Sequence, residues 1–554
     1  MTGVILSPES RSWVDAFKAT HGRVPRVLHI GNIANNAYNI ATLLNGAGLD
    51  CDVICYDYYH VMGCPEWEDA DFTGPIIDQF QPDWAAIDLH GFQRPRWFAQ
   101  GPLAQCIDYL IAKRSGDAEN EERHWAALGG CNRTIPPRLG DTVPTHVPSE
   151  QGTRYGRYFK TLLDHPDIYN LARRRFRYWD DSIFPVGKLV SIALCSGISV
   201  AAICLRGLVA VCAWLPVRFS RERRTFARIV KRSVQRFKRA FPDRVDMLTA
   251  KDVEMYRYVL TKWRRLLECY DIVQAYATDP ILSLLANKRP YVAFEHGTLR
   301  TFTLRDDPIC RLTSLAYREA DHVFITNGDC LAYANAIGVR RYSPMLHPVD
   351  QEKIRAVPGN YEKLHRDMGV HYVFLCTLRH DWDIKGTDQY IRALPRLAAE
   401  IGTSFKLIMT NWGSQLVDSR RLAEELGVSQ YVDWIDPLPR LRLVSLQKSV
   451  DIVLDQIALP HFGATAPEAI AAEVPVIMSY DPASTKWLVA EPAPVLPAWT
   501  VDEIVAQVKT ALDPVWREQY KLAARRWIDD YHNIQIVAAA HMNIYRSLLN
   551  DSKL

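Results

Sequence analysis

The chain is 554 residues long, more than one hydrophobic core accommodates, so two or three domains are expected. Hydrophobic residues make up 48% of it and charged residues 23%, a composition that excludes a largely disordered protein. The 66 basic and 63 acidic residues nearly cancel to a net charge of +3, so the total charge by itself indicates no class of partner.

Short apolar runs alternate with helical patterns in the first half of the chain, which is typical of βαβ units and a parallel sheet. The first strand ends in a loop that begins with Gly31 and Asn32. An insertion from about Gly91 to Pro242 interrupts the pattern. The expected strands are Arg26–Ile30, Cys51–Tyr56, Trp84–Leu89, Tyr270–Ala277, Tyr291–Glu295 and His322–Thr326.

A second series of strands follows the linker His347–Asp350. The expected strands are His371–Thr377, Phe405–Thr410, Tyr431–Ile435, Asp451–Leu454 and Pro475–Met478. The predicted fold class is therefore α/β, with two Rossmann-like doubly wound parallel-sheet domains, residues 1–350 and 351–515. Helices in 516–554 are expected to return to the first domain. Open sheets of this kind bind ligands at the carboxyl ends of their strands, so a central cleft between the two domains is the expected site.

The second domain carries the residue types that an anionic ligand needs. Arg379 and Lys385 lie in one loop after a strand, where an Arg can bind a diphosphate bidentately and a Lys adds a point charge. Gly463, Ala464 and Thr465 form a turn into a helix, whose free N–H groups suit anionic oxygen. Glu468, in the first turn, can accept hydrogen bonds from vicinal hydroxyls such as those of a ribose.

These motifs resemble the donor-binding domain of family 4 glycosyltransferases, the retaining enzymes of the GT-B fold. The pieces that match are RHDWDIKGTD (379–388), FKLIMTNWG (405–413), LGVSQYVDWIDPLPR (426–440) and HFGATAPEAIAAEVPVI (461–477). In the first half, FEHGT (294–298), EADHVFITNG (319–328) and MLHPVD (345–350) resemble the end of that family's acceptor domain.

The resemblance implies a role for each matching residue. Arg379 and Lys385 would bind the donor diphosphate, Glu468 the ribose, and His296 would lie near the reacting sugar. Gly31 and Asn32 would belong to the acceptor-side loop. The implied donor-binding set is Arg379, Lys385, Ile435, Gly463, Ala464, Thr465 and Glu468, and the implied catalytic residues are His296, Arg379 and Lys385.

Two positions depart from the family pattern. Pro460 stands where the first Glu of the E-x7-E motif is expected, and a proline cannot accept hydrogen bonds from the sugar. Asp455 or His461 would be the substitute. Glu473 stands where the family usually has Gly.

No metal or cofactor is expected. Asp381-Trp382-Asp383 has the D-x-D form of metal-dependent transferases, but within the loop from Arg379 to Lys385 it is better interpreted as an exposed turn.

The insertion has a membrane-type pattern within residues 189–241. Leu189–Leu205 is an uncharged apolar run, and Gly207–Val217 extends it past Arg206. A span needs about 20 apolar residues, so the two runs together are long enough. The segment Arg218–Arg239 follows with ten basic residues and one acidic residue. Near one helical face of it lie Phe226, Ile229, Val230, Phe237 and Phe241.

Strands before and after the insertion belong to one sheet, which excludes a single crossing. We expect monotopic attachment to an anionic membrane surface, with a helix pair buried against protein as the alternative. Nucleic acid is the less favoured partner of the basic stripe. Twelve cysteines without C-x-x-C spacing and an N-terminal segment without a signal-peptide pattern predict a cytoplasmic location.

Together these features predict a glycosyltransferase that moves a sugar from a nucleotide-sugar donor to an acceptor. If the insertion touches a membrane, the acceptor is a lipid or lipid-linked glycan. The alternative is a non-catalytic GT-B-like subunit that binds nucleotide sugar or glycan, or that serves as a scaffold. Pro460 favours this alternative, whereas the joint presence of Arg379, Lys385 and Glu468 favours the enzyme.

Overall fold

The computed structural model describes residues 4, 6–56, 60–74, 76–79, 82–128, 221–302, 305–460 and 462–551. The chain divides into two compact units. The first comprises Met1–Leu139, Lys262–Leu304 and Thr313–Leu554, and the second comprises Gly140–Thr261 and Arg305–Leu312.

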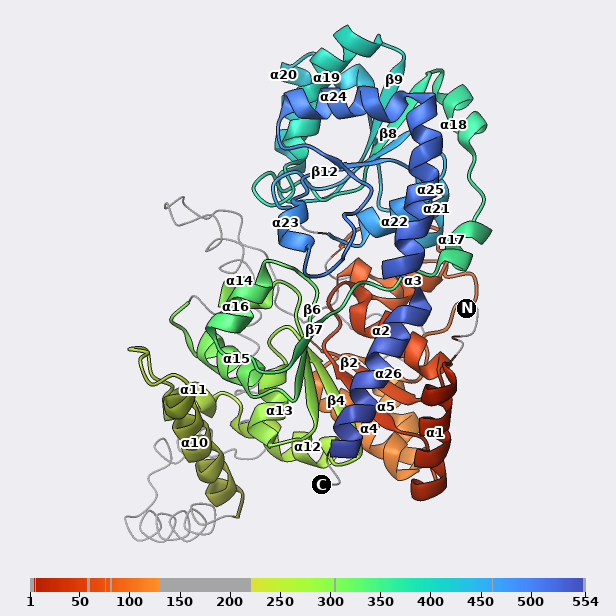
Figure 1. The fold of residues 1–554 in the computed structure, drawn as a ribbon. Coiled ribbons are helices and arrows are strands. Elements are labelled where there is room, and N and C mark those ends of the chain that lie inside the picture. Colours follow the sequence, from red (N-terminus) through yellow and green to blue (C-terminus); the bar gives the residue numbers. More distant parts are fainter. Residues whose placement is uncertain are drawn as a thin grey trace, which may run out of the picture. The chain divides into compact units, whose positions relative to one another are not determined.

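The first unit contains two sheets, and the strands of the first are all parallel in the order β3-β2-β1-β4-β5-β6-β7 (Figure 1). Its strands are β1 (Arg26–Ile30), β2 (Asp50–Cys55), β3 (Phe98–Gln100), β4 (Ile272–Tyr276), β5 (Tyr291–Phe294), β6 (His322–Ile325) and β7 (Tyr342–Pro344). β1, β2, β4, β5 and β6 are buried along almost their whole length, as is typical of a parallel sheet with helices on its faces.

The third strand was expected in the wrong place. Trp84–Ala86 is a 3-10 helix, η3, begun by the Asp83 side chain, which accepts from the Ala85 amide at 3.1 Å. Trp84 packs against Phe72 in a small separate cluster, so its segment is apolar without belonging to the sheet. The true third strand, β3, lies inside the span expected as insertion. Its three residues are too few to form a recognisable strand pattern in the sequence.

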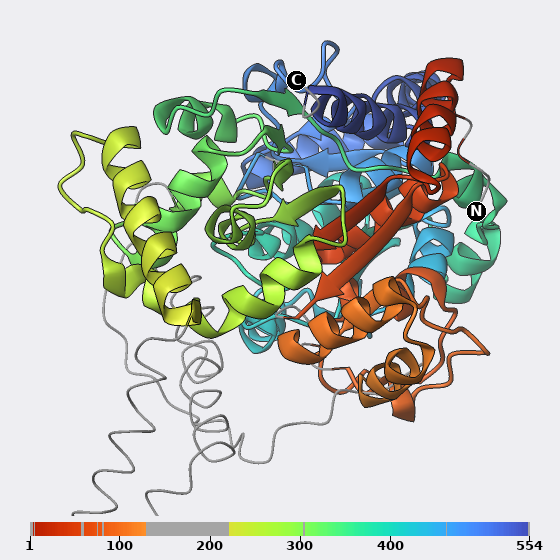
Figure 2. The same ribbon diagram turned by 90° about the horizontal axis from the view of Figure 1, so that it is seen from below.

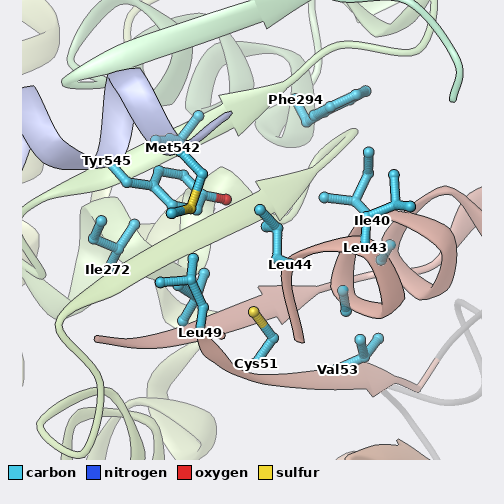
Figure 3. Packing of buried hydrophobic residues seen from close by; sticks show 14 of the residues in the cluster. Ile40, Leu43, Leu44, Leu49, Cys51, Val53, Ile272, Phe294, Met542 and Tyr545 are labelled. Carbon is cyan, nitrogen blue, oxygen red and sulfur yellow. The ribbon is translucent and has the colours of Figure 1, made fainter. Parts of the chain in front are cut away.

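One face of this sheet is covered by α1 (Pro8–His21), α2 (Asn36–Gly46) and α26 (Ile534–Asp551), and α26 lies beside α1 (Figure 2). Met542 and Tyr545 of α26 join Ile272 of β4 and Leu44 of α2 in one core (Figure 3). The other helices of this half are η1 (Ile33–Asn35), η2 (Val61–Gly63), α3 (Pro65–Asp69), α4 (Leu103–Ser115), α5 (Ala118–Ala127), α12 (Arg257–Leu267), α13 (Pro280–Ala286), α14 (Thr298–Phe302), α15 (Pro308–Arg318) and α16 (Cys330–Ala336).

The second sheet has six parallel strands in the order β10-β9-β8-β11-β12-β13. Its strands are β8 (Tyr372–Cys376), β9 (Phe405–Thr410), β10 (Val432–Ile435), β11 (Ile452–Leu454), β12 (Val476–Met478) and β13 (Leu496–Pro497). Its helices are α17 (Gln351–Ala356), α18 (Tyr361–Met368), α19 (Thr387–Ile401), α20 (Leu416–Glu425), η4 (Ser429–Tyr431), α21 (Arg440–Gln447), α22 (Thr465–Ala471), α23 (Pro482–Thr485), α24 (Val501–Leu512) and α25 (Pro514–Tyr531). The expected fold class, two Rossmann-like parallel-sheet domains as in the GT-B fold, is confirmed.

The chain passes between the two sheets twice, and the two passing segments pair with each other. The linker residue Val349 donates its amide to the His532 carbonyl at 2.8 Å, and His532 Nδ1 lies 2.8 Å from the His347 carbonyl. α25 packs on the second sheet through Tyr520 and Trp527, so α26 is the helix that returns to the first sheet.

The second unit includes α10 (Arg221–Ala240) and α11 (Ala250–Glu254), which pack together. Phe226, Phe237 and Phe241 are buried within the protein, and Arg257 stacks over Phe226 at 5.6 Å. These three rings are therefore covered by protein, and membrane contact of this segment stays a prediction. The described helices include no candidate membrane span, and the apolar run 189–217 lies outside the described residues.

Candidate functional site

The second sheet has its topological switch point between β8 and β11. These strands are neighbours, although the chain forms β9 and β10 on the far side of β8 before it returns to β11. The loop after β8 carries Arg379 and Lys385, and the loop after β11 leads to Glu468. Because the strands are parallel, both loops leave the same edge of the sheet, where doubly wound domains bind ligands.

Asp381 organises the loop after β8. Its Oδ2 lies 3.2 Å from Nη2 of Arg379, its Oδ1 accepts from the Ile384 amide at 3.2 Å, and its carbonyl accepts from the Lys385 amide at 2.7 Å. The D-x-D sequence is thus part of a turn that holds Arg379. Among the described residues no group of three or more His, Cys, Asp or Glu could hold a metal ion.

Lys385 is held by a neutral side chain. Its Nζ donates to Oε1 of Gln456 at 2.6 Å, and Nε2 of Gln456 donates to the Leu459 carbonyl at 3.1 Å. Burial lowers the pKa of Lys385, Asp455 opposes the shift, and the positive charge of Arg379 adds to it. Repulsion between the two positive charges favours binding of an anion beside them.

Asp455 is one of the two residues expected to replace the missing Glu at Pro460. It directly follows β11 and is 1% exposed, and among the described residues none hydrogen-bonds its Oδ2. Burial raises its pKa, and the nearby Lys385 opposes the shift. Its carboxyl group is turned into the protein, whereas Pro460 is partly exposed in the loop beyond it. The other expected substitute, His461, lies outside the described residues.

Gly463 and Ala464 lead into α22, which starts at Thr465 and has seven residues. So short a helix has a small dipole, and the cations of the neighbouring loop supply most of the positive charge at this edge. Glu468 lies in the first turn and is buried. Its Oε1 lies 3.1 Å from Nη2 of Arg440, and burial raises its pKa to about 6 although Arg440 opposes the shift.

The remaining positions expected in this domain lie further out or serve the fold. Ile435 ends β10, which β9 separates from β8. Glu473 has a φ of +63°, which explains why a Gly is expected there. Both of its oxygens pair with Arg525, at 2.5 and 2.7 Å.

In the first sheet, the switch point lies between β1 and β4, and Gly31 follows β1. Gly31 has a φ of +89°, and a Cβ there would lie 2.5 Å from Oδ2 of Asp279, in the loop after β4. Asn32 is fully buried and tethers neighbouring loops. Its Nδ2 donates to Oδ1 of Asn35 and to the Gly63 carbonyl, and its Oδ1 accepts from the Tyr38 amide.

His296 follows β5 at the same edge of the first sheet. Its ring stacks on Tyr276 at 5.6 Å between centroids, and Phe294 lies 4.9 Å away. Burial and the neighbouring His347 lower its pKa to about 3. The imidazole is therefore neutral near pH 7, and within the described part of the chain none of the residues hydrogen-bonds its buried Nε2. The structure brings Arg379 and Lys385 together, but His296 belongs to the other sheet.

Three neighbours of these residues were missed from the sequence: Gln456, Arg440 and Asp279. Each acts through a partner that is distant along the chain, and the matching piece 426–440 that ends at Arg440 gives no sign of that partner. A cavity of about 60 Å³ is lined by Glu68, Asp69, Lys353 and Arg440, among others. It is too small for a nucleotide, which needs roughly 300 Å³ or more.

Residues 371–513 match the family model described as "Glycosyl transferases group 1". No curated protein sequence matches the chain.

Solved structures resemble it at low identity. Sucrose-phosphate synthase from Thermosynechococcus elongatus is 14% identical over 54% of this chain and 80% of its own, with a TM-score of 0.44. The Anabaena protein HepE in complex with UDP and glucose is 17% identical over 54% and 82%, with a TM-score of 0.43. The structure described as "Trehalose-6-phosphate from E. coli bound with UDP-2-fluoro glucose" is 14% identical over 55% of this chain and 81% of its own, with a TM-score of 0.44. Similarity at this level concerns the fold alone, and the matched segment 371–513 is the part of the chain that carries Arg379, Lys385 and Glu468.

Proposed function

We propose that the protein is a glycosyltransferase that moves a sugar from a nucleotide-sugar donor to an acceptor. The observation that carries the proposal is the grouping of Arg379, Lys385 and Glu468 at the switch point of the second sheet. It lies within the segment that matches glycosyl transferases group 1.

In the proposed reaction, Arg379 and Lys385 bind the diphosphate and stabilise the charge that develops on it as the bond to the sugar breaks. Glu468 accepts hydrogen bonds from the ribose hydroxyls. The sugar is transferred with retention, and the leaving phosphate takes the acceptor proton on the same face. Neutral His296 contacts the reacting sugar as a hydrogen-bonding group. The two side chains provide the positive charge, so the proposal includes no metal ion.

The first assay measures thermal stabilisation of the protein by UDP, GDP and ADP and by their glucose conjugates. The second assay measures the slow hydrolysis of these conjugates by the protein. Arg379→Ala and Lys385→Ala are each expected to abolish the stabilisation and to lower hydrolysis about a hundredfold or more. Arg421→Ala is the matched control, because Arg421 is exposed and pairs with Asp418 on α20. A wild-type protein that none of these nucleotides stabilises would refute the proposal, as would an Arg379→Ala variant with near-normal hydrolysis.

Pro460 supports a second candidate function, a non-catalytic subunit that binds nucleotide sugar. The sugar-binding Glu that the family resemblance implies is replaced by Pro460, and Asp455 is buried. A non-catalytic subunit is expected to be stabilised by nucleotides but to catalyse neither hydrolysis nor transfer. An enzyme is expected to be stabilised and to catalyse both reactions.

We further propose that the exposed basic face of α10 holds the protein at an anionic membrane surface on the cytoplasmic side. Arg228, Lys231, Arg232, Lys238 and Arg239 are all exposed. Because the phenylalanines of this helix are buried in protein, we propose that the helix binds the membrane through electrostatic attraction. A lipid or lipid-linked glycan is the acceptor that this location supports.

A further inference from the structure

Arg440 is the ionic partner of the candidate ribose-binding carboxylate. Its Nη2 lies 3.1 Å from Oε1 of Glu468, and both side chains are largely buried. Oε2 of Glu468 makes no hydrogen bond or ion pair with any described residue. One carboxylate oxygen is therefore fixed, and the other is open to a donor.

The same guanidinium also binds the first half of the chain. Nη1 of Arg440 pairs with Oε1 of Glu68, in the short helix α3. Trp67, the preceding residue, donates its Nε1 to the Leu438 carbonyl at 3.0 Å, immediately before α21. Because its two terminal nitrogens bind different carboxylates, the planar fork of Arg440 has a defined orientation.

α3 itself is fixed by contacts on either side of Glu68. Glu66 accepts from Nε of Arg94 at 2.9 Å, and Asp69 accepts from the Tyr38 hydroxyl at 2.6 Å and from Lys353 at 2.8 Å. Glu68 is therefore a rigid anchor, which gives Arg440 a set position beside Glu468.

The charges of this group explain what Arg440 does for Glu468. Two buried carboxylates share one guanidinium, and Oε2 of Glu68 is buried without a hydrogen bond from any described residue. Burial favours the protonated form of Glu468, and Arg440 is the main group that opposes this shift. Arg440 therefore keeps Glu468 ionised, as a hydrogen-bond acceptor, near neutral pH.

We propose that Arg440, anchored by Glu68, is a positioning residue that aims the free oxygen of Glu468 at the ribose diol of the nucleotide. The inference rests on the proposed function, because it needs a nucleotide at the switch point. Glu468 then distinguishes ribose from a sugar without hydroxyls, and this selectivity depends on Arg440.

The experiment compares binding of UDP, GDP and ADP with that of their 2′,3′-dideoxy forms, by titration calorimetry. The full-length wild-type protein is expected to bind the ribonucleotide about tenfold or more tightly, as a hydrogen bond to a charged group provides. In Arg440→Gln this ratio is expected to fall to about one, because Glu468 is no longer held in place or kept ionised.

Arg440→Gln leaves two buried carboxylates without a cation and is at risk of misfolding. The double variant Arg440→Gln/Glu68→Gln removes one of them and is expected to show the same loss of selectivity. Glu68→Gln alone keeps Arg440 beside Glu468 but replaces its anchoring carboxylate with a weaker amide acceptor, so the ratio is expected to fall only part of the way.

Arg442→Gln is the matched control. Arg442 lies on the same helix and binds Asp71 at 2.6 Å, near α3, so it contributes to the same junction without touching Glu468. The ratio of ribonucleotide to dideoxynucleotide affinity in Arg442→Gln is expected to equal that of the wild type. A folded double variant that keeps the ratio overturns the inference, and so does a wild type that binds both forms equally. If no nucleoside diphosphate binds the wild type, the proposed function fails as well.

Discussion

Nζ of Lys385 lies 2.6 Å from Oε1 of Gln456, so an amide oxygen connects the candidate phosphate-binding cation to the strand beside it. Gln456 follows β11, whereas Lys385 belongs to the loop after β8. The amide orients the ammonium group and leaves its charge intact. A carboxylate at the same place would orient it equally well and cancel the charge.

Gln456→Glu is therefore expected to weaken nucleoside diphosphate binding about tenfold or more, because the new carboxylate pairs with Lys385 and repels phosphate. Gln456→Ala keeps the charge of Lys385 and is expected to cause a smaller loss. Titration calorimetry with UDP, GDP and ADP measures the affinity of each variant. Equal affinities for the two variants would show that the charge of Lys385 does not act on the ligand.

Gly31→Ala is expected to destabilise the first domain by about 3 kcal/mol, since it combines a left-handed φ with a clash against the Asp279 carboxylate. Gly22→Ala separates the two effects. Gly22 has a φ of +70°, but no atom lies within 4 Å of the added Cβ, so a loss of about 1 kcal/mol is expected. Urea denaturation of the two variants gives the comparison, and equal losses would mean that Asp279 moves aside freely.

The sequence predicted those parts of the molecule that depend on local patterns. Buried parallel strands such as β5 and β8 are continuous apolar runs, and the loop from Arg379 to Lys385 follows a strand, as its motif indicated. The third strand was misplaced because the Trp84 segment is as apolar as a strand, although it packs in a separate cluster.

Pairings between distant residues leave no such pattern. Glu68 and Arg440 are 372 positions apart, and either residue alone is an ordinary surface charge in the sequence. Amphipathic periodicity in α10 correctly predicted a helix with one apolar face. It did not reveal whether protein or lipid covers Phe237, because both require the same spacing.

The pKa of Glu468, raised to about 6, predicts a pH dependence of nucleotide binding. Above this pKa the carboxylate is ionised and accepts hydrogen bonds from the ribose, and below it the group is protonated and accepts them poorly. Arg440 faces the carboxylate as its cation, with Glu68, Lys353 and Asp455 as the other charged groups nearby. The contribution of Glu468 is therefore expected to be present above pH 6 and to be lost as the pH falls through this value.

The phosphate groups of the ligand titrate in the same range, so the measurement needs Glu468→Gln as its reference. The ratio of the two dissociation constants cancels the phosphate contribution. At a pH of about 7.5 the wild type is expected to bind UDP roughly tenfold more tightly than the variant, and near pH 5 about equally. A ratio that does not change with pH would show that the Glu468 carboxylate does not contact the nucleotide.

The exposed face of α10 predicts binding to anionic membranes that depends on charge and salt. Lys231→Gln/Arg232→Gln removes two exposed cations, each worth about 1 kcal/mol at an anionic surface, so vesicle affinity is expected to fall about thirtyfold. Co-sedimentation with phosphatidylserine-containing vesicles measures this affinity, with pure phosphatidylcholine vesicles for comparison.

The matched control is Arg421→Gln/Lys521→Gln, which removes the same charge from surface positions on α20 and α25. If the α10 variant and the control bind alike, this face does not contact the membrane. If the wild type binds neutral and anionic vesicles equally, apolar insertion outweighs electrostatic attraction and the proposed role of the basic face is wrong.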